Sequence, residues 1–217
     1  GSRPEDFDAG GSTPLLFAAR HGDVESASLL LASGANINAV TPDKTSVLVF
    51  AAHSGQGAFA AYLLEKGADP NADGSGYTAL HAAVLRGDVN LVKALLAHHA
   101  DPNAKVKQAT PMNRDSKDFA VATGWIGGTP FWLAAKFAEP EIMRALVAAG
   151  ADPRLAGPNA TTPLMVAAGV GRTGARDVDD RRGRRLDPTE IAAISESGDD
   201  ERKTLEAVKV AALELGS

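Results

Sequence analysis

The sequence contains no cysteine, few aromatic residues and no long apolar run. The absence of cysteine from the 217 residues excludes disulfide bonds and thiolate chemistry, and it leaves the redox compartment open. No stretch of about 18 apolar residues occurs, so no membrane-spanning helix is predicted. Aromatic residues make up only 5% of the chain. Alanine and leucine must therefore supply most of a core that hydrophobic residues, at 44%, are abundant enough to form.

Acidic residues outnumber basic ones. With 27 Asp and Glu against 22 Lys and Arg, the formal net charge is −5, which argues against a surface built to neutralise nucleic-acid phosphates. The sequence also lacks a P-loop, a dinucleotide-binding glycine pattern, an HExxH motif and a Gly-x-Ser-x-Gly motif. We therefore expect no catalytic residues, no cofactor, no metal site, no nucleic-acid partner and no insertion into a membrane.

The chain contains the same pattern five times. Its first half is a word that begins with Thr or Ser and contains paired alanines, found as TPLLFAARHG, SVLVFAAHSG, TALHAAVLRG, TPFWLAAKFA and TPLMVAAGVG. Its second half is an apolar segment, which ends in SGANIN, KGADPN, HHADPN and AGADP in the first four copies. Thr13 and Ser46 are 33 positions apart, as are Thr129 and Thr162. The chain is therefore an array of similar units.

Each half of the unit predicts a helix. The initial Thr or Ser can cap the free backbone amides, and proline suits the first turn that follows. The alanine pair, such as Ala18–Ala19, favours helix and lets the first helix approach its neighbours closely. Paired apolar residues, such as Leu63–Leu64, give the second helix a buried face. A glycine usually follows that helix, where a left-handed backbone is needed, and His99 is expected to adopt this conformation in the third copy.

These words resemble the ankyrin repeat, whose typical sequence is Thr-Pro-Leu-His, then two alanines and a closing Gly-Ala-Asp-x-Asn. The second copy departs from it with Ser46-Val47, and only His81 keeps the histidine, for which a structural hydrogen bond is expected. The resemblance implies an all-α ankyrin-repeat solenoid of helix-turn-helix units with short β-hairpin fingers and two insertions. We expect one domain, 1–217, with repeats at about 8–39, 41–72, 73–104, 124–156 and 157–216.

Two insertions interrupt the array. The first, at about 105–123, continues into apolar residues, and we expect an ordered finger that folds back on the third and fourth repeats; a mobile loop is the alternative. The second, at about 172–202, begins with an Arg- and Asp-rich stretch that predicts a mobile, solvated linker. A site for an acidic or phosphorylated partner is the alternative there. Asp187 and Pro188 then predict the start of a short helix.

The resemblance implies that a partner protein binds the concave face, which the fingers and the first helices form. Carried over to this sequence, the variable positions give ten candidate contact residues: Tyr77, Leu85, Arg86, Trp125, Ile126, Lys136, Phe137, Arg20, His21 and His53. The central aromatic and apolar members are expected to be partly exposed and to form an interface hot spot. The alternative is that the first insertion covers them, with Trp125 and Phe119 as a small core. Trp132 is expected to pack inside.

We therefore predict a monomeric, non-catalytic protein–protein interaction module with an unidentified protein partner. One alternative is a regulatory or targeting domain of a larger enzyme or membrane protein, because the incomplete fifth repeat suggests a fragment of a longer array. A hydrolytic or metal-dependent enzyme is a third hypothesis, with His53 as the residue to test. Metal binding by His21 with His53, or by His99 with His98 and Asp101, is the minor alternative to structural roles for these histidines. The Ala-, Gly- and Asp-rich composition is typical of a bacterial protein. The compartment stays open between the cytoplasm and export after removal of a signal peptide.

Overall fold

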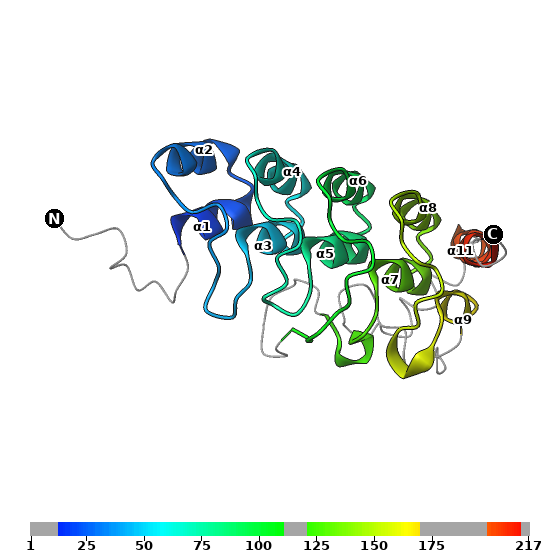
Figure 1. Cartoon of the computed structure of the whole chain (residues 1–217). Coiled ribbons are helices and arrows are strands. Elements are labelled where there is room, and N and C mark those ends of the chain that lie inside the picture. The colour runs from blue at the N-terminus through cyan, green and yellow to red at the C-terminus, as the bar shows by residue number, and fades with distance from the viewer. Residues whose placement is uncertain (1–12, 111–120, 170–198, 214–217) are drawn as a thin grey trace, which may run out of the picture.

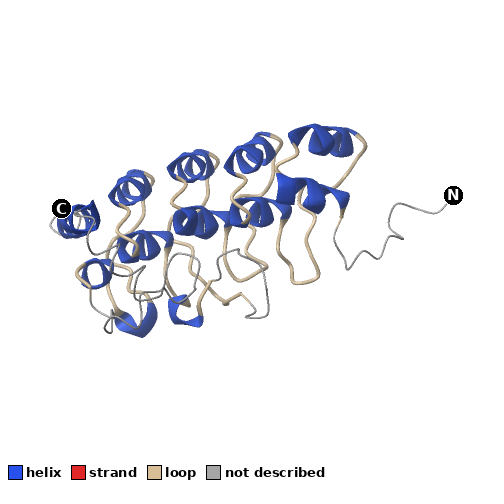
Figure 2. Ribbon diagram, turned by 180° about the vertical axis from the view of Figure 1, so that it is seen from behind, coloured by secondary structure: helices blue, strands red, loops and turns tan. Residues whose placement is uncertain are grey.

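The structure is a row of helix pairs (Figure 1). The computed structural model describes residues 13–110, 121–169 and 199–213. These ranges contain ten α-helices and no β-strand (Figure 2). Helices α1, α3, α5, α7 and α9, which we call the inner helices, lie in one layer, and α2, α4, α6, α8 and α11, the outer helices, lie in the other. The predicted all-α architecture of helix-turn-helix units is confirmed.

The first four inner helices are each followed directly by the outer helix that packs against them. The inner helices are α1 (Pro14–His21), α3 (Val47–His53), α5 (Ala79–Arg86), α7 (Pro130–Lys136) and α9 (Pro163–Ala167). The outer helices are α2 (Val24–Ala32), α4 (Gly57–Glu65), α6 (Val89–Ala97), α8 (Pro140–Ala148) and α11 (Asp199–Leu213). The 3-10 helices η2 (Thr123–Trp125) and η3 (Pro158–Ala160) lie in connecting loops.

The inner helices begin where the repeated words predict. The Thr129 hydroxyl accepts a hydrogen bond from the Trp132 amide at 3.1 Å, and Pro130 occupies the first turn of α7. In the second copy the Ser46 hydroxyl accepts from the Val49 amide at 3.2 Å. Serine therefore keeps the cap that threonine supplies elsewhere, since both hydroxyls satisfy an amide that the helix leaves unpaired.

The outer helices end in a left-handed residue, as predicted. Gly34, Gly67 and Gly150 have φ angles of 91°, 91° and 90°, and His99 adopts a φ of 65° at the equivalent position of the third copy. A left-handed residue at this place lets the chain leave the helix while its amide pairs with the last carbonyls. The expectation of a left-handed His99 is confirmed.

The core lies between the layers and between neighbouring pairs. The paired alanines of the first four inner helices are at most 6% exposed, and Leu63, Leu95 and Leu146 of the outer helices are 0% exposed. Each inner helix packs on the next along the row. Because every pair buries one face against the following pair, the stability of the array depends on contacts between neighbours.

Asparagine side chains link the loops that follow successive outer helices. Asn38 Oδ1 accepts from the Asp69 amide at 2.9 Å, and Asn71 Oδ1 accepts from the Asp101 amide at 2.7 Å. Asn103 Oδ1 accepts from the Asp152 amide at 2.8 Å. We call these three links the asparagine ladder. The ladder reaches the fourth loop and ends there, because Arg154 stands where the next asparagine would be.

Loops that we call fingers, at 36–46, 69–78, 101–129 and 152–162, join each outer helix to the next inner helix. In the described ranges they contain no β-strand and a single isolated antiparallel bridge, between Val40 and Ser46. The third finger carries the first insertion. Its two sides pair with each other, because the Thr110 amide donates to the Val121 carbonyl at 3.0 Å and the Gly127 amide donates to the Val106 carbonyl at 2.7 Å.

The last outer helix, α11, packs against α8 and α9. It begins at Asp199, inside the segment predicted as the second insertion, and it buries Ala207, Val210 and Ala211. An Arg144–Glu206 ion pair of 2.6 Å joins it to α8. Residues 170–198, which include the Arg-rich stretch and the short helix predicted from Asp187, lie outside the described residues.

Candidate functional site

The candidate binding surface is the side of the array that the inner helices and the fingers line, which we call the inner surface (Figure 1). It corresponds to the concave face expected from the sequence. Every Lys and Arg of the inner helices lies in a last turn: Arg20 in α1, Arg86 in α5 and Lys136 in α7. His21 and His53 also lie in the last turns of α1 and α3. Cations are favoured there because the carbonyl ends of helices carry partial negative charge.

Six of the ten candidate contact residues are accessible to a partner. Arg20 and His21 are exposed, and Ile126 is 43% exposed. Arg86, Lys136 and Phe137 are half-buried. The Lys136 ammonium lies 6.0 Å from the centre of the Phe137 ring, close enough for a cation–π contact.

The other four candidates are buried, and the expectation that Tyr77, Leu85 and Trp125 are partly exposed is wrong. Tyr77 is 3%, Leu85 0%, Trp125 2% and His53 6% exposed. The Tyr77 hydroxyl and His53 Nδ1 lie 3.0 Å apart and form a hydrogen bond between the second finger and helix α3. Both polar groups are therefore used inside the array, since a buried hydroxyl needs a partner.

Arg86 connects two neighbouring inner helices. Its guanidinium donates from Nε to the His53 carbonyl at 2.8 Å and also from Nη2. The His53 carbonyl belongs to the last turn of α3, whose carbonyls have no partner within their own helix. Gln56 serves α1 in the same way, because its amide donates to the Arg20 carbonyl at 3.2 Å. Arg86 is thus a structural cap as well as a surface residue.

Trp125, which closely follows the first insertion, is buried. The Trp125 ring meets the Phe137 ring edge-on, with 5.5 Å between the ring centres and 86° between the planes. Val106 and Val121, from the two sides of the insertion, are each 1% exposed. The burial of Trp125 that the alternative expects is therefore confirmed, but Trp125, Val106 and Val121 belong to the continuous core of the array. Phe119, the second residue proposed for that core, lies outside the described residues.

His81 and Trp132 occupy equivalent positions and make equivalent bonds. His81 Nε2 donates to the Ala104 carbonyl at 3.1 Å, and its Nδ1 accepts from the Thr78 amide at 3.1 Å. Burial lowers the pKa of His81 to about 4, against the opposing effect of its bond to Ala104. Trp132 is 4% exposed and donates from Nε1 to the Thr161 carbonyl at 3.1 Å. The structural roles predicted for both residues are confirmed.

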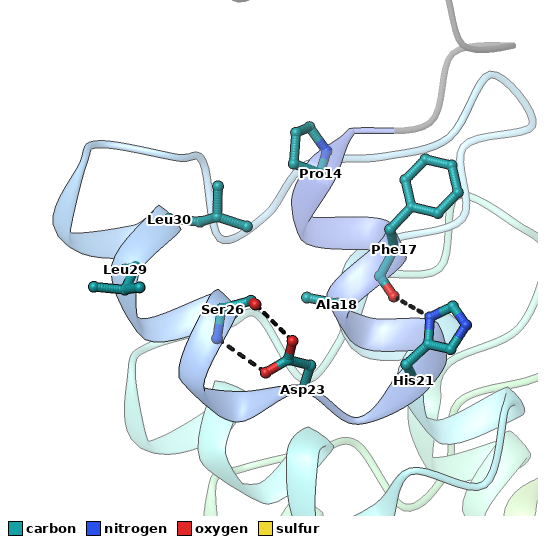
Figure 3. A pocket seen from close by; sticks show the side chains of 8 residues that line it. All are labelled: Pro14, Phe17, Ala18, His21, Asp23, Ser26, Leu29 and Leu30. Carbon is teal, nitrogen blue, oxygen red and sulfur yellow. Dashed lines mark hydrogen bonds between the residues drawn. The ribbon is translucent and has the colours of Figure 1, made fainter.

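A hollow at the N-terminal end of the array was not predicted. It has a volume of about 600 Å³. Its lining residues come from α1, α2 and the turn between them: Pro14, Phe17, Ala18, His21, Asp23, Ser26, Leu29 and Leu30 (Figure 3). Phe17 is 49% and Leu29 66% exposed. Ser26 occupies the position that the buried Phe59, Leu91 and Ile142 hold in the next three outer helices. This polar residue was the sequence feature that could have indicated an exposed end of the array.

Three further observations concern the described residues. Among the described residues, no group of three or more His, Cys, Asp or Glu side chains is placed to hold a metal ion. No helix in the described ranges combines the length and the apolar character needed to cross a lipid bilayer. His53, which the enzyme hypothesis singled out, is bonded to Tyr77 inside the array.

Comparison with known proteins identifies the repeats. The family described as ankyrin repeats, in three copies, matches residues 15–106. Ankyrin repeats are typically non-catalytic modules of protein–protein interaction. No curated protein matches the chain. The copies that we identify at Thr129 and Thr162 lie beyond the matched segment, but their helix pairs continue the same stack. Residues 15–106 therefore match ankyrin repeats, within an all-α array whose architecture is consistent with an ankyrin solenoid.

Proposed function

We propose that this chain is a non-catalytic recognition module that binds a protein partner on its inner surface. One observation supports this surface in particular. Ile126 is 43% exposed although it directly follows the buried Trp125, whose ring packs on Phe137. An exposed apolar side chain that follows the packed Trp125–Phe137 pair, with Lys136 near the Phe137 ring, has the composition of an interface hot spot.

The proposed contact residues are the accessible ones: Arg20, His21, Arg86, Ile126, Lys136 and Phe137. The buried candidates support them from beneath. Tyr77 and His53 hold neighbouring repeats together, and Trp125 orients the segment that carries Ile126. Because these supports are rigid, little conformational entropy is lost when a partner binds.

Site-specific photo-crosslinking tests the proposal. A photoreactive amino acid replaces Ile126 in one variant and Lys203, an exposed residue of the outer helix α11, in a matched control. In lysate of the organism that encodes the chain, we expect the variant at position 126 to capture a discrete protein that the control does not capture. Capture of the same protein from position 203 alone, or of no protein from position 126, would refute the proposal.

A substitution at the same position gives an independent check. Ile126→Glu should weaken capture of that protein by about thirtyfold or more, because a hot-spot residue contributes about 2 kcal/mol or more. The melting temperature should hardly change, since an exposed side chain contributes little to folding. Equal capture by Ile126→Glu and the unmodified chain would place the partner elsewhere.

A further inference from the structure

The charges of the inner surface differ in sign from the chain as a whole. The whole chain carries a formal net charge of −5. The five inner helices contain no Asp or Glu, and their basic residues include Arg20, Arg86 and Lys136. Resting on the proposed function, we infer that the partner segment bound on the inner surface is acidic, with apolar residues interspersed.

The fingers carry charges of both signs. Their exposed basic residues include Lys44, Lys105 and Lys107. Among the described residues, the acidic residues of the fingers are Asp43, Asp73 and the three aspartates of the asparagine ladder, Asp69, Asp101 and Asp152. Asp73 forms an ion pair with Lys107. Among the described residues, the fingers and the inner helices together contain seven Lys and Arg against five Asp and no Glu. A surface with this excess attracts an acidic chain and repels a basic one.

Several of these cations also have structural roles, which limits the part that each plays in attraction. Arg86 donates to the His53 carbonyl, and Lys107 is paired with Asp73. Asp23 lies three positions after Arg20 and keeps its negative charge, because its hydrogen bonds to Ser26 lower the pKa of its carboxyl group. The residues best placed to attract a partner therefore include the exposed Arg20, Lys44 and Lys105.

The apolar part of the inference comes from the third finger. Ile126 is 43% exposed, and the half-buried Phe137 ring lies beneath Lys136. An apolar side chain of the partner can cover Ile126 and remove apolar surface from water, while a neighbouring carboxylate meets Lys136. A purely acidic segment would leave Ile126 exposed, so the expected ligand mixes acidic and apolar residues.

A defined peptide probe tests the inference on the full chain. The probe is a fluorescent peptide with the repeating unit Glu-Glu-Leu, and its matched opposite repeats Lys-Lys-Leu. We expect the acidic peptide to bind at low salt and to lose affinity as salt is added, because ions screen exposed charges beyond about 10 Å at moderate salt. The basic peptide is expected not to bind.

Charge reversal locates the binding. Arg20→Glu combined with Lys44→Glu should weaken binding of the acidic peptide by about tenfold or more, because close charge pairs across an interface can contribute that much. Lys203→Glu, on α11, changes one exposed charge by the same amount and should leave the affinity unchanged. Circular dichroism of both variants checks that the fold is retained. Absence of acidic-peptide binding, equal binding of the basic peptide, or an unaffected double variant would overturn the inference.

Two further outcomes separate this inference from other conclusions. Tighter binding of oligothymidylate than of the acidic peptide would mean that the surface selects phosphates, and the inference would fail. If the protein crosslinked at position 126 binds the double variant as strongly as the unmodified chain, the partner is not recognised through acidic residues. The proposed function would then stand while the inference falls. Capture of nothing at position 126 is the separate result that defeats the proposed function.

Discussion

Removal of the Trp125 side chain measures how much the base of the first insertion stabilises the array. Trp125 is 2% exposed and packs edge-on against Phe137 with 5.5 Å between ring centres. Truncation of a buried Trp to Ala costs about 3–5 kcal/mol, which combines the lost transfer energy with the cavity left behind. Within that sum, the aromatic contact itself contributes about 0.5–1.5 kcal/mol.

The measurement is chemical denaturation followed by far-ultraviolet circular dichroism, with a thermal melt of the same samples. A chain of this size loses about 2–4 °C of melting temperature per kcal/mol when it unfolds in one step. Trp125→Ala should therefore lower the melting temperature by about 10 °C. A double-mutant cycle with Phe137→Ala should return a coupling energy of about 0.5–1.5 kcal/mol.

The neighbouring residue supplies the control. Ile126 is 43% exposed, so Ile126→Ala should cost less than about 1 kcal/mol. The reasoning is refuted if Trp125→Ala unfolds within about 1 kcal/mol of the unmodified chain, or if Ile126→Ala is equally damaging. Either result would mean that the insertion base does not hold Trp125 in a packed core.

Three more predictions follow from buried or strained positions. Because the unfolded chain protonates His81 near pH 6.5 and the folded protein only near pH 4, stability should fall as pH drops between these values, by about 3 kcal/mol. Denaturation series for the unmodified chain and His81→Leu check this, and equal slopes would contradict it. Asn103→Ala removes bonds of 3.1 and 2.8 Å to the next loop and should cost about 1–2 kcal/mol by urea unfolding. Gly76→Ala places a methyl group 2.2 Å from Gln108 Cβ at a φ of 90° and should cost at least about 2 kcal/mol, more than Gly34→Ala, where the added group meets nothing within 4 Å.

The helices were predictable because their signals are local. A capping Thr129 and the Pro130 that follows decide where α7 begins, whatever the rest of the chain does. The left-handed His99 was predictable for the same reason, since its place after an outer helix requires that backbone conformation. Repetition strengthened each prediction, because a helix start or end recognised in one copy indicated the same feature at the equivalent position of the other copies.

Exposure was harder to predict because it depends on residues far away in the chain. The ankyrin pattern places Trp125 near the concave face, but its burial depends on the pairing of Val106 with Gly127 and on the Phe137 ring. The role of Arg86 likewise required the position of the α3 carboxyl end, 33 residues earlier. Contacts of this kind follow from how neighbouring units stack, and the sequence pattern of a single unit does not contain them.

The asparagine ladder has a mechanical consequence. Three successive junctions are clamped along one edge by side chains of one fixed length, so the spacing of the loops at that edge resists change. The junction after Arg154 is held elsewhere, by the Arg144–Glu206 ion pair of the outer layer and the Trp132–Thr161 bond near the fingers. Because the asparagine ladder does not extend to this junction, thermal bending of the array should concentrate there. The last helix pair then sets how far that end of the inner surface opens.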